Sequence, residues 1–198
     1  MKRILLLLFP LLFLTACSMI MPISDEPQES EADTLHSALT EYTNATINHE
    51  VDKLITFVYP KVFTLIDKDQ MVYLLKKIEA SGKAPKITQI AHKDISDIYT
   101  YEKGVYSIIL SDMYMELKSP VINNPEYEMF LYVMLKKQMG GDAVIDFDKS
   151  RHLYRIKKDS KIIGINEENQ GWKFVGYEQA KKYASWDIIP KEIALHLK

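Results

Sequence analysis

The spacing of apolar residues predicts that the domain begins with three helices. Apolar side chains recur every three or four positions, which is the period of an amphipathic helix. The second pattern stops at Tyr59-Pro60, because proline disfavours helical geometry in the residue before it. The predicted helices are residues 34–48, residues 50–58, and a third that runs to Ala80 from a cap at Asp67 or Asp69.

After Pro85 the apolar period changes from 3.6 to 2, which predicts strands. One further helix interrupts them, opening at Asn124-Pro125 and ending at Met139 before two glycines. The predicted strands are residues 86–100, 105–118, 143–147, 152–157, 161–166 and 171–176, followed by a helical stretch at 178–186 and a last turn after Pro190. Helices first and antiparallel strands afterwards predict an α+β fold, with the helices packed on one face of a curved antiparallel sheet.

This order of elements resembles the nuclear transport factor 2-like superfamily. The resemblance rests on the three leading helices, the Tyr59-Pro60 break, the long paired strands and the late strand Gly171-Trp172-Lys173-Phe174-Val175. It implies a cystatin-like α+β cone with a hollow, a scaffold also used by exported bacterial lipoproteins. The helix at 125–139 is an addition to the minimal cone.

The N-terminus predicts export. Lys2 and Arg3 precede an apolar run at residues 4–14, which is shorter than the roughly 20 residues that span a bilayer. An uncleaved anchor is the alternative, since no charged residue occurs from Ile4 to Ser24, although Pro10 interrupts that stretch.

The sequence Leu14-Thr15-Ala16-Cys17 resembles the lipobox of bacterial lipoproteins, with an apolar residue, two small residues and then cysteine. The resemblance implies that diacylglycerol is attached to the Cys17 sulfur, that a peptidase cuts before Cys17, and that the new amino group is acylated. In a Gram-negative cell, serine rather than aspartate at position 18 favours the outer membrane. We therefore expect a protein of the cell envelope that contacts the bilayer through acylated Cys17.

These features divide the chain into a signal peptide at residues 1–16, a lipidated N-terminus and disordered tether at 17–33, and a single domain at 34–198. The tether is rich in proline and acidic residues and contains no aromatic residue. Removing residues 1–16 changes the formal net charge from −2 to −4, which argues against nucleic acid as a partner. Since Cys17 is the only cysteine, the domain is expected to contain no disulfide.

The sequence carries no assembled motif for metal or cofactor chemistry, so we expect neither. The five histidines are scattered without the spacing of a local ligand set. His92 and Asp94 are expected to share a strand face, either as an exposed pair or, less often, as metal ligands. Five methionines either line a binding groove or, more commonly, fill gaps in the core: Met113, Met115, Met129, Met134 and Met139.

Asp112 is the candidate for catalysis. Strand alternation places it on one face with Tyr106 and Tyr114, so a carboxylate interrupts an apolar and aromatic stripe. The superfamily resemblance implies a hollow in which a desolvated aspartate with a raised pKa acts beside a tyrosine. The simpler interpretation is that Asp112 marks a bulge or the emergence of the strand into solvent.

Three functions follow from these observations. The first is a non-catalytic, membrane-anchored binding or scaffold module for a protein or a small apolar ligand. The second is a small-molecule isomerase, dehydratase or hydrolase that uses Asp112 with Tyr106 or Tyr114. The third is a structural envelope lipoprotein that works only as an oligomer.

Replacing Cys17 by Ser tests the anchor. The thiol is the group that receives the lipid, so the Cys17→Ser chain is expected to leave the membrane fraction, or to remain there only as an uncleaved precursor of higher mass. Fractionation followed by mass determination distinguishes these forms. A variant with the mass and membrane partitioning of the original chain would contradict lipidation at Cys17.

Overall fold

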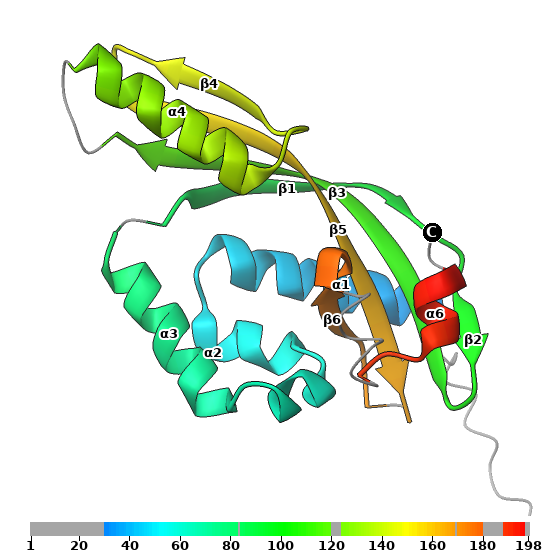
Figure 1. The fold of residues 1–198 in the computed structure, drawn as a ribbon. Coiled ribbons are helices and arrows are strands. Elements are labelled where there is room, and N and C mark those ends of the chain that lie inside the picture. Colours follow the sequence, from blue (N-terminus) through cyan, green and yellow to red (C-terminus); the bar gives the residue numbers. More distant parts are fainter. Residues whose placement is uncertain (1–29, 83, 120–123, 169, 180–187, 197–198) are drawn as a thin grey trace, which may run out of the picture.

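The structure is a computed structural model that describes residues 30–82, 84–119, 124–168, 170–179 and 188–196 (Figure 1). The predicted signal peptide, nearly all of the predicted tether and most of the helical stretch expected at 178–186 lie outside the described residues.

The three leading helices are confirmed. They are α1 (Glu31–Ile47), α2 (Val51–Leu54), which continues into a 3-10 turn η1 (Ile55–Phe57), and α3 (Lys68–Ala80); a second 3-10 turn η2 (Pro60–Thr64) follows the Tyr59-Pro60 break. The first helix begins three residues before the predicted start, because the Ser30 hydroxyl accepts a hydrogen bond from the Asp33 N–H and caps it there. No described helix combines the length and the apolar character needed to span a membrane.

The strands form one curled antiparallel sheet after these helices, so the α+β class is confirmed. They are β1 (Lys86–Ile95), β2 (Tyr99–Tyr101), β3 (Gly104–Lys118), β4 (Val144–Asp148), β5 (Leu153–Glu167) and β6 (Lys173–Gly176). Strands β3 and β5 pair along all fifteen residues of each. Strands β1 and β2 share the other edge of β3, while β4 and β6 share the other edge of β5. The remaining elements are α4 (Pro125–Met139), as predicted, η3 (Tyr177–Gln179) and α6 (Lys191–His196).

The strands predicted at 86–100, 152–157 and 161–166 are divided differently in the structure, and the strand predicted at 171–176 begins only at Lys173. The strand expected at 86–100 is interrupted after Ile95 and resumes as β2. The two strands expected at 152–157 and 161–166 are one strand, β5, because the polar residues between them keep their backbone pairing with Met113, Asp112 and Ser111 of β3. A short polar stretch is typical of a turn. Here it remains part of the strand, because every residue of it pairs with β3.

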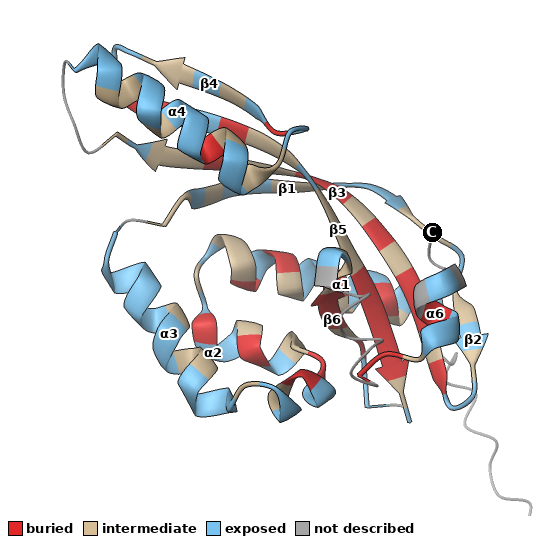
Figure 2. Cartoon of the chain, viewed as in Figure 1, coloured by how far each residue is buried: buried red, intermediate tan, exposed pale blue. Residues whose placement is uncertain are grey.

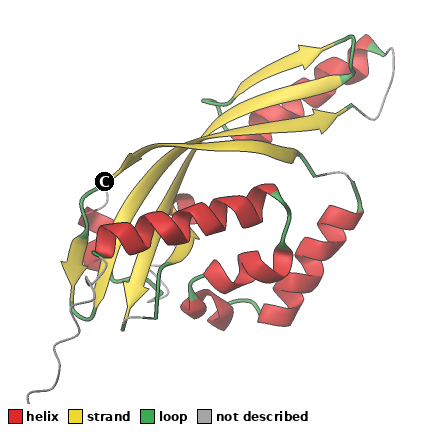
Figure 3. Cartoon of the chain, turned by 180° about the vertical axis from the view of Figure 1, so that it is seen from behind, coloured by secondary structure: helices red, strands yellow, loops and turns green. Residues whose placement is uncertain are grey.

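The apolar core lies in separate clusters at the two ends of the sheet. Figures 1 and 3 show the helices at these ends, α1 and α6 at one and α4 at the other. At one end α1 packs Leu35 and Leu39 on Ile109 and Trp172, and α6 packs Ile193 near Tyr106 on the opposite face. The expectation that the helices cover one face is therefore wrong at this end, because the C-terminal segment supplies a layer on the other face.

At the far end α4 packs Leu135 on Met115, Tyr154 and Ile156. The five methionines do not share one role. Met115 is buried and Met113 and Met139 pack around this cluster, whereas Met129 and Met134 are exposed on the outer side of α4. Figure 2 shows α3 as largely exposed, and none of its residues is buried.

Truncating Ile163 tests the core of the paired strands. This side chain is completely buried between Tyr106, Val175 and Ile189, so Ile163→Ala is expected to lower the free energy of unfolding by about 2–5 kcal/mol. Val144 is 62% exposed on the same sheet, and Val144→Thr should change the free energy by less than about 0.5 kcal/mol. Urea unfolding followed by circular dichroism measures both, and equal effects would contradict this packing.

Candidate functional site

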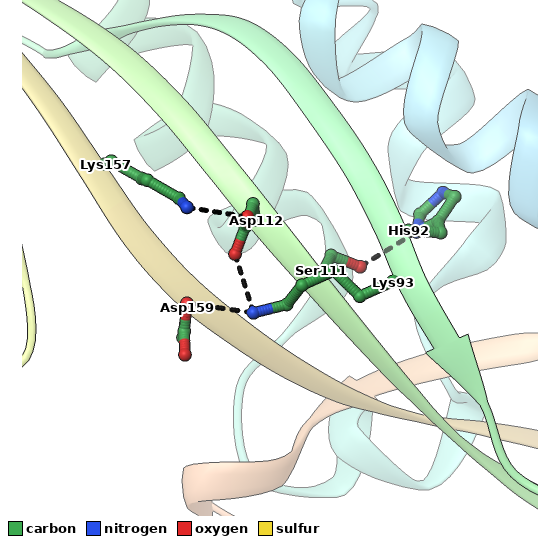
Figure 4. A network of polar contacts seen from close by, with 6 residues as sticks. All are labelled: His92, Lys93, Ser111, Asp112, Lys157 and Asp159. Carbon is green, nitrogen blue, oxygen red and sulfur yellow. Dashed lines mark hydrogen bonds and ion pairs between the residues drawn. The ribbon is translucent and has the colours of Figure 1, made fainter.

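Asp112 lies in a cluster of charged side chains at the middle of the sheet (Figure 4). The residue is only 8% exposed, and its two carboxylate oxygens contact the Nζ of Lys93 at 2.7 Å and the Nζ of Lys157 at 2.8 Å. Lys93 also contacts Asp159 at 3.2 Å. The carboxylate is therefore held between two cations contributed by the strands on either side.

A bulge in β1 makes this cluster possible. The pairing of β1 with β3 shifts between His92 and Asp94, so Lys93 is the extra residue and reaches the face on which Asp112 lies. Asp159 is the direct partner of Asp112 on β5, and two facing carboxylates repel each other. Lys93 bridges both carboxylates and removes that repulsion.

The electrostatics are the reverse of those expected for a catalytic acid. Hydrogen bonds from Lys157 and Lys93 lower the pKa of Asp112 to about 2, and the same contacts raise the pKa of each lysine. The expectation of a raised pKa at Asp112 is therefore wrong, because the neighbouring cations outweigh desolvation.

The structure does not bring the three candidate residues together. Tyr114 lies beside Asp112, with the Lys157 ammonium 5.7 Å from the centre of its ring. Tyr106 lies six residues along β3, about 20 Å away, where it is buried in the core. On that face the hollow expected from the resemblance is filled by apolar side chains, including Ile163, Ile189 and Ile193.

His92 joins α1 to the sheet. Its Nδ1 lies 2.8 Å from the Ser111 hydroxyl, and its Nε2 lies 2.9 Å from the Thr43 hydroxyl. Desolvation, followed by the charge of His36, lowers the pKa of His92. The expectation that His92 and Asp94 share a face is wrong, because the bulge separates them. Across the described ranges, no three acidic, histidine or cysteine side chains are grouped so as to hold a metal.

A second acidic cluster was not predicted. The Glu167 carboxylate accepts hydrogen bonds of 2.8 Å from the hydroxyls of Tyr59 and Tyr106, and the Lys61 ammonium lies 3.1 Å from it. Burial alone would raise the pKa of Glu167, but these donors outweigh burial and lower it. Burial, and then the bond to Glu167, raise the pKa of both tyrosines.

Gly104 makes room for this cluster. It pairs directly with Glu167, and a Cβ there would lie 2.8 Å from the Tyr106 hydroxyl. A hollow of about 300 Å³ opens beside Lys61 and Glu167. Gly104 at the start of β3 is the one sequence feature that could have indicated this cluster. It does so only when the register is known, because the register places it opposite Glu167 at the end of β5.

A cleft of about 750 Å³ lies along the edge of β5. Strand β4 pairs with β5 only as far as Lys157, and β6 pairs with it only from Ile162, so neither covers residues 158–160 on that edge. The C-terminal end of α4 forms one wall of the cleft and Gly176 and Tyr177 form another. Lys93 and Asp159, which belong to the Asp112 cluster, also line it.

The lining of this cleft is amphipathic. Apolar side chains come from Met113, Met115 and Met139. Charges of both signs surround them, from Lys93, Lys137, Lys158 and Lys161 and from Asp142, Asp159 and Glu178. The cleft thus combines strand backbone that neither β4 nor β6 pairs with, adaptable apolar side chains and charged side chains. No single residue type in the sequence announces this combination, since it depends on where β4 ends and β6 begins.

In comparisons with known proteins, no family model matches the chain, and no curated protein or solved structure is significantly similar to it.

The Asp112 cluster is expected to make stability depend on acidity. The pKa of Asp112 is 3.8 when unfolded and about 2 when folded, so its contribution is complete above pH 3.8 and is lost as the pH falls toward 2. In Asp112→Asn the free energy of unfolding should fall less steeply between pH 4 and 2 than in the original chain. Lys157→Met removes one cation and should give an intermediate slope. Denaturation at each pH measures the three slopes, and equal slopes would show that the lysines do not hold Asp112 ionised.

Proposed function

We propose that this protein is a lipid-anchored protein of the cell envelope whose domain, a cone related to the nuclear transport factor 2-like superfamily, binds an extended segment of a partner protein. The lipobox at Leu14-Thr15-Ala16-Cys17 supports the anchor. The order of helices followed by a curled antiparallel sheet is compatible with the cone.

The cleft beside residues 158–160 carries the proposal of binding. Along an antiparallel strand the N–H and C=O groups of successive residues point alternately to the two edges, so this stretch presents backbone groups to the cleft. An extended peptide satisfies such groups by adding itself as a short strand, which is a common mode of peptide recognition. The gap between β4 and β6 limits such a segment to a few residues.

The side chains of the cleft indicate what the segment contains. Met113, Met115 and Met139 are flexible and polarizable, so they adapt to apolar side chains of different shapes. The favoured ligand is a short extended segment with apolar residues at its centre.

The alternative, a small-molecule enzyme, is better supported at Glu167 than at Asp112. Glu167 lies between two tyrosines and beside a hollow of about 300 Å³, which is the combination of an acid and a tyrosine expected for such chemistry. The directions of the pKa shifts oppose it, since Glu167 stays ionised and both tyrosines stay protonated near neutral pH. Binding therefore remains the leading proposal.

Site-specific photocrosslinking tests the proposal in cells. A photoreactive residue at Ser160, in the middle of the uncovered edge, is expected to give an adduct with a second, different polypeptide, whereas one at the exposed Lys76 of α3 should not. The same probe in a Met139→Glu background should lose the adduct, because a carboxylate is introduced into the apolar part of the cleft.

The absence of an adduct at Ser160 would overturn binding of a protein in the cleft. Turnover of small molecules by the purified domain, lost in Glu167→Gln but kept in Met139→Glu, would favour the enzymatic alternative.

A further inference from the structure

Helix α4 is apolar on two opposite sides. Its inner side packs Leu131, Leu135 and Met139 on the sheet. Its outer side exposes Met129 by 64%, Phe130 by 57%, Val133 by 56% and Met134 by 46%. A helix that covers a sheet in a monomer normally carries polar residues on its outer side, so this side is built to meet another surface.

The residues on the outer side of α4 form a stripe whose spacing is symmetric about its middle. With 3.6 residues per turn, six residues fall on one side of the helix, opposite Leu135. From first to last, they are Glu126, Met129, Phe130, Val133, Met134 and Lys137. Glu126 and Lys137 are equally far from the middle of the stripe, as are Met129 and Met134, and Phe130 and Val133. The stripe therefore has an acidic end, an apolar centre and a basic end.

We propose that α4 packs against α4 of a second copy of this chain, antiparallel, around a two-fold axis at the middle of the stripe. In this arrangement Phe130 of each copy meets Val133 of the other, and Met129 meets Met134. Glu126 of each copy meets Lys137 of the other, so the two-fold axis forms this ion pair twice. A parallel arrangement would instead place like charges together at both ends, which gives the antiparallel direction its preference.

The size of the stripe fits such a contact. The exposed apolar side chains amount to on the order of 500 Å² per copy, the size of the largest apolar patches on monomers. Two copies together bury about 1,000 Å², which is near the lower limit for a specific interface. The expected dimer is therefore reversible.

Helix α4 lies far along the sheet from the start of the described chain. Glu31, at the start of α1, contacts Asn166 near the end of β5, whereas Glu128 of α4 contacts Tyr154 near its beginning. The twelve residues between Tyr154 and Asn166 span about 40 Å of strand. Helix α4 thus lies at the end of the molecule away from the point at which the described chain begins (Figure 1).

Cysteine crosslinking combined with charge reversal tests the dimer in cells that express the full-length chain. Val133→Cys places a thiol beside the axis, and a short bismaleimide should link two copies into a species of twice the mass of the single mature chain. The original chain measures the background from Cys17. Ile78→Cys, at a 52% exposed position on α3, is the matched control and should give only background.

The charge variants are made in the Val133→Cys background. Glu126→Lys and Lys137→Glu each place like charges at both ends of the contact, and each should reduce the crosslinked fraction at least fivefold. The double variant restores opposite charges and should recover most of it. If the variants acted only by destabilising the helix, the double variant should give the lowest crosslinked fraction, since it places both charges at unfavourable helix ends.

Three results would overturn the proposal. The first is crosslinking of Val133→Cys at the background level although a monofunctional maleimide labels the thiol. The second is a crosslinked species that contains another protein, and the third is a double variant whose crosslinked fraction is no higher than that of the single variants. Protection of the Val133→Cys thiol by membranes, without a linked pair, would indicate a lipid surface in place of a second copy.

Discussion

The pairing of β3 with β5 is the interaction on which the rest of the structure depends. Both strands are fifteen residues long and pair without a break, whereas every other strand covers only part of an edge. The twist of paired strands accumulates along their length. One face of a long pair therefore points in different directions at its two ends. The helices gather at those ends, and the middle of the pair is left with β1 on one edge and the open cleft on the other.

The same pairing decides the chemistry of the polar residues. It places Asp112 opposite Asp159 and Gly104 opposite Glu167. The first pairing is repulsive and is stabilised by Lys93 and Lys157, which is why Asp112 is ionised and unsuited to donate a proton near neutral pH. The second gives Tyr106 the space to reach Glu167 and ties the Tyr59 segment to the sheet.

Much of the fold could be predicted from the sequence because it depends on local patterns. The cap at Asn124, the proline that follows it and the glycine after Met139 predicted both ends of α4 correctly. The continuity of β5 could not be predicted, since residues 158–160 look like a turn and their strand geometry depends on β3. The bulge at Lys93 was hidden for the same reason, and with it the separation of His92 from Asp94. Asp112 was found by strand alternation, but its charge state depends on partners from two other strands, and Glu167 was missed because it follows its strand's last apolar residue.

The polar middle of the paired strands has a consequence for how the molecule unfolds. Ser111 and Asp112 on β3 face Ser160 and Asp159 on β5, so the apolar cluster under α4 is separated from the clusters at the other end. The two ends are connected by the ladder of backbone hydrogen bonds and by the polar contacts of Asp112 and His92, and not by packed apolar side chains. Such an arrangement divides a domain into two cooperative units that open with different free energies. The α4 end therefore has an apolar core of its own, which allows it to open with a free energy different from that of the end nearer α1.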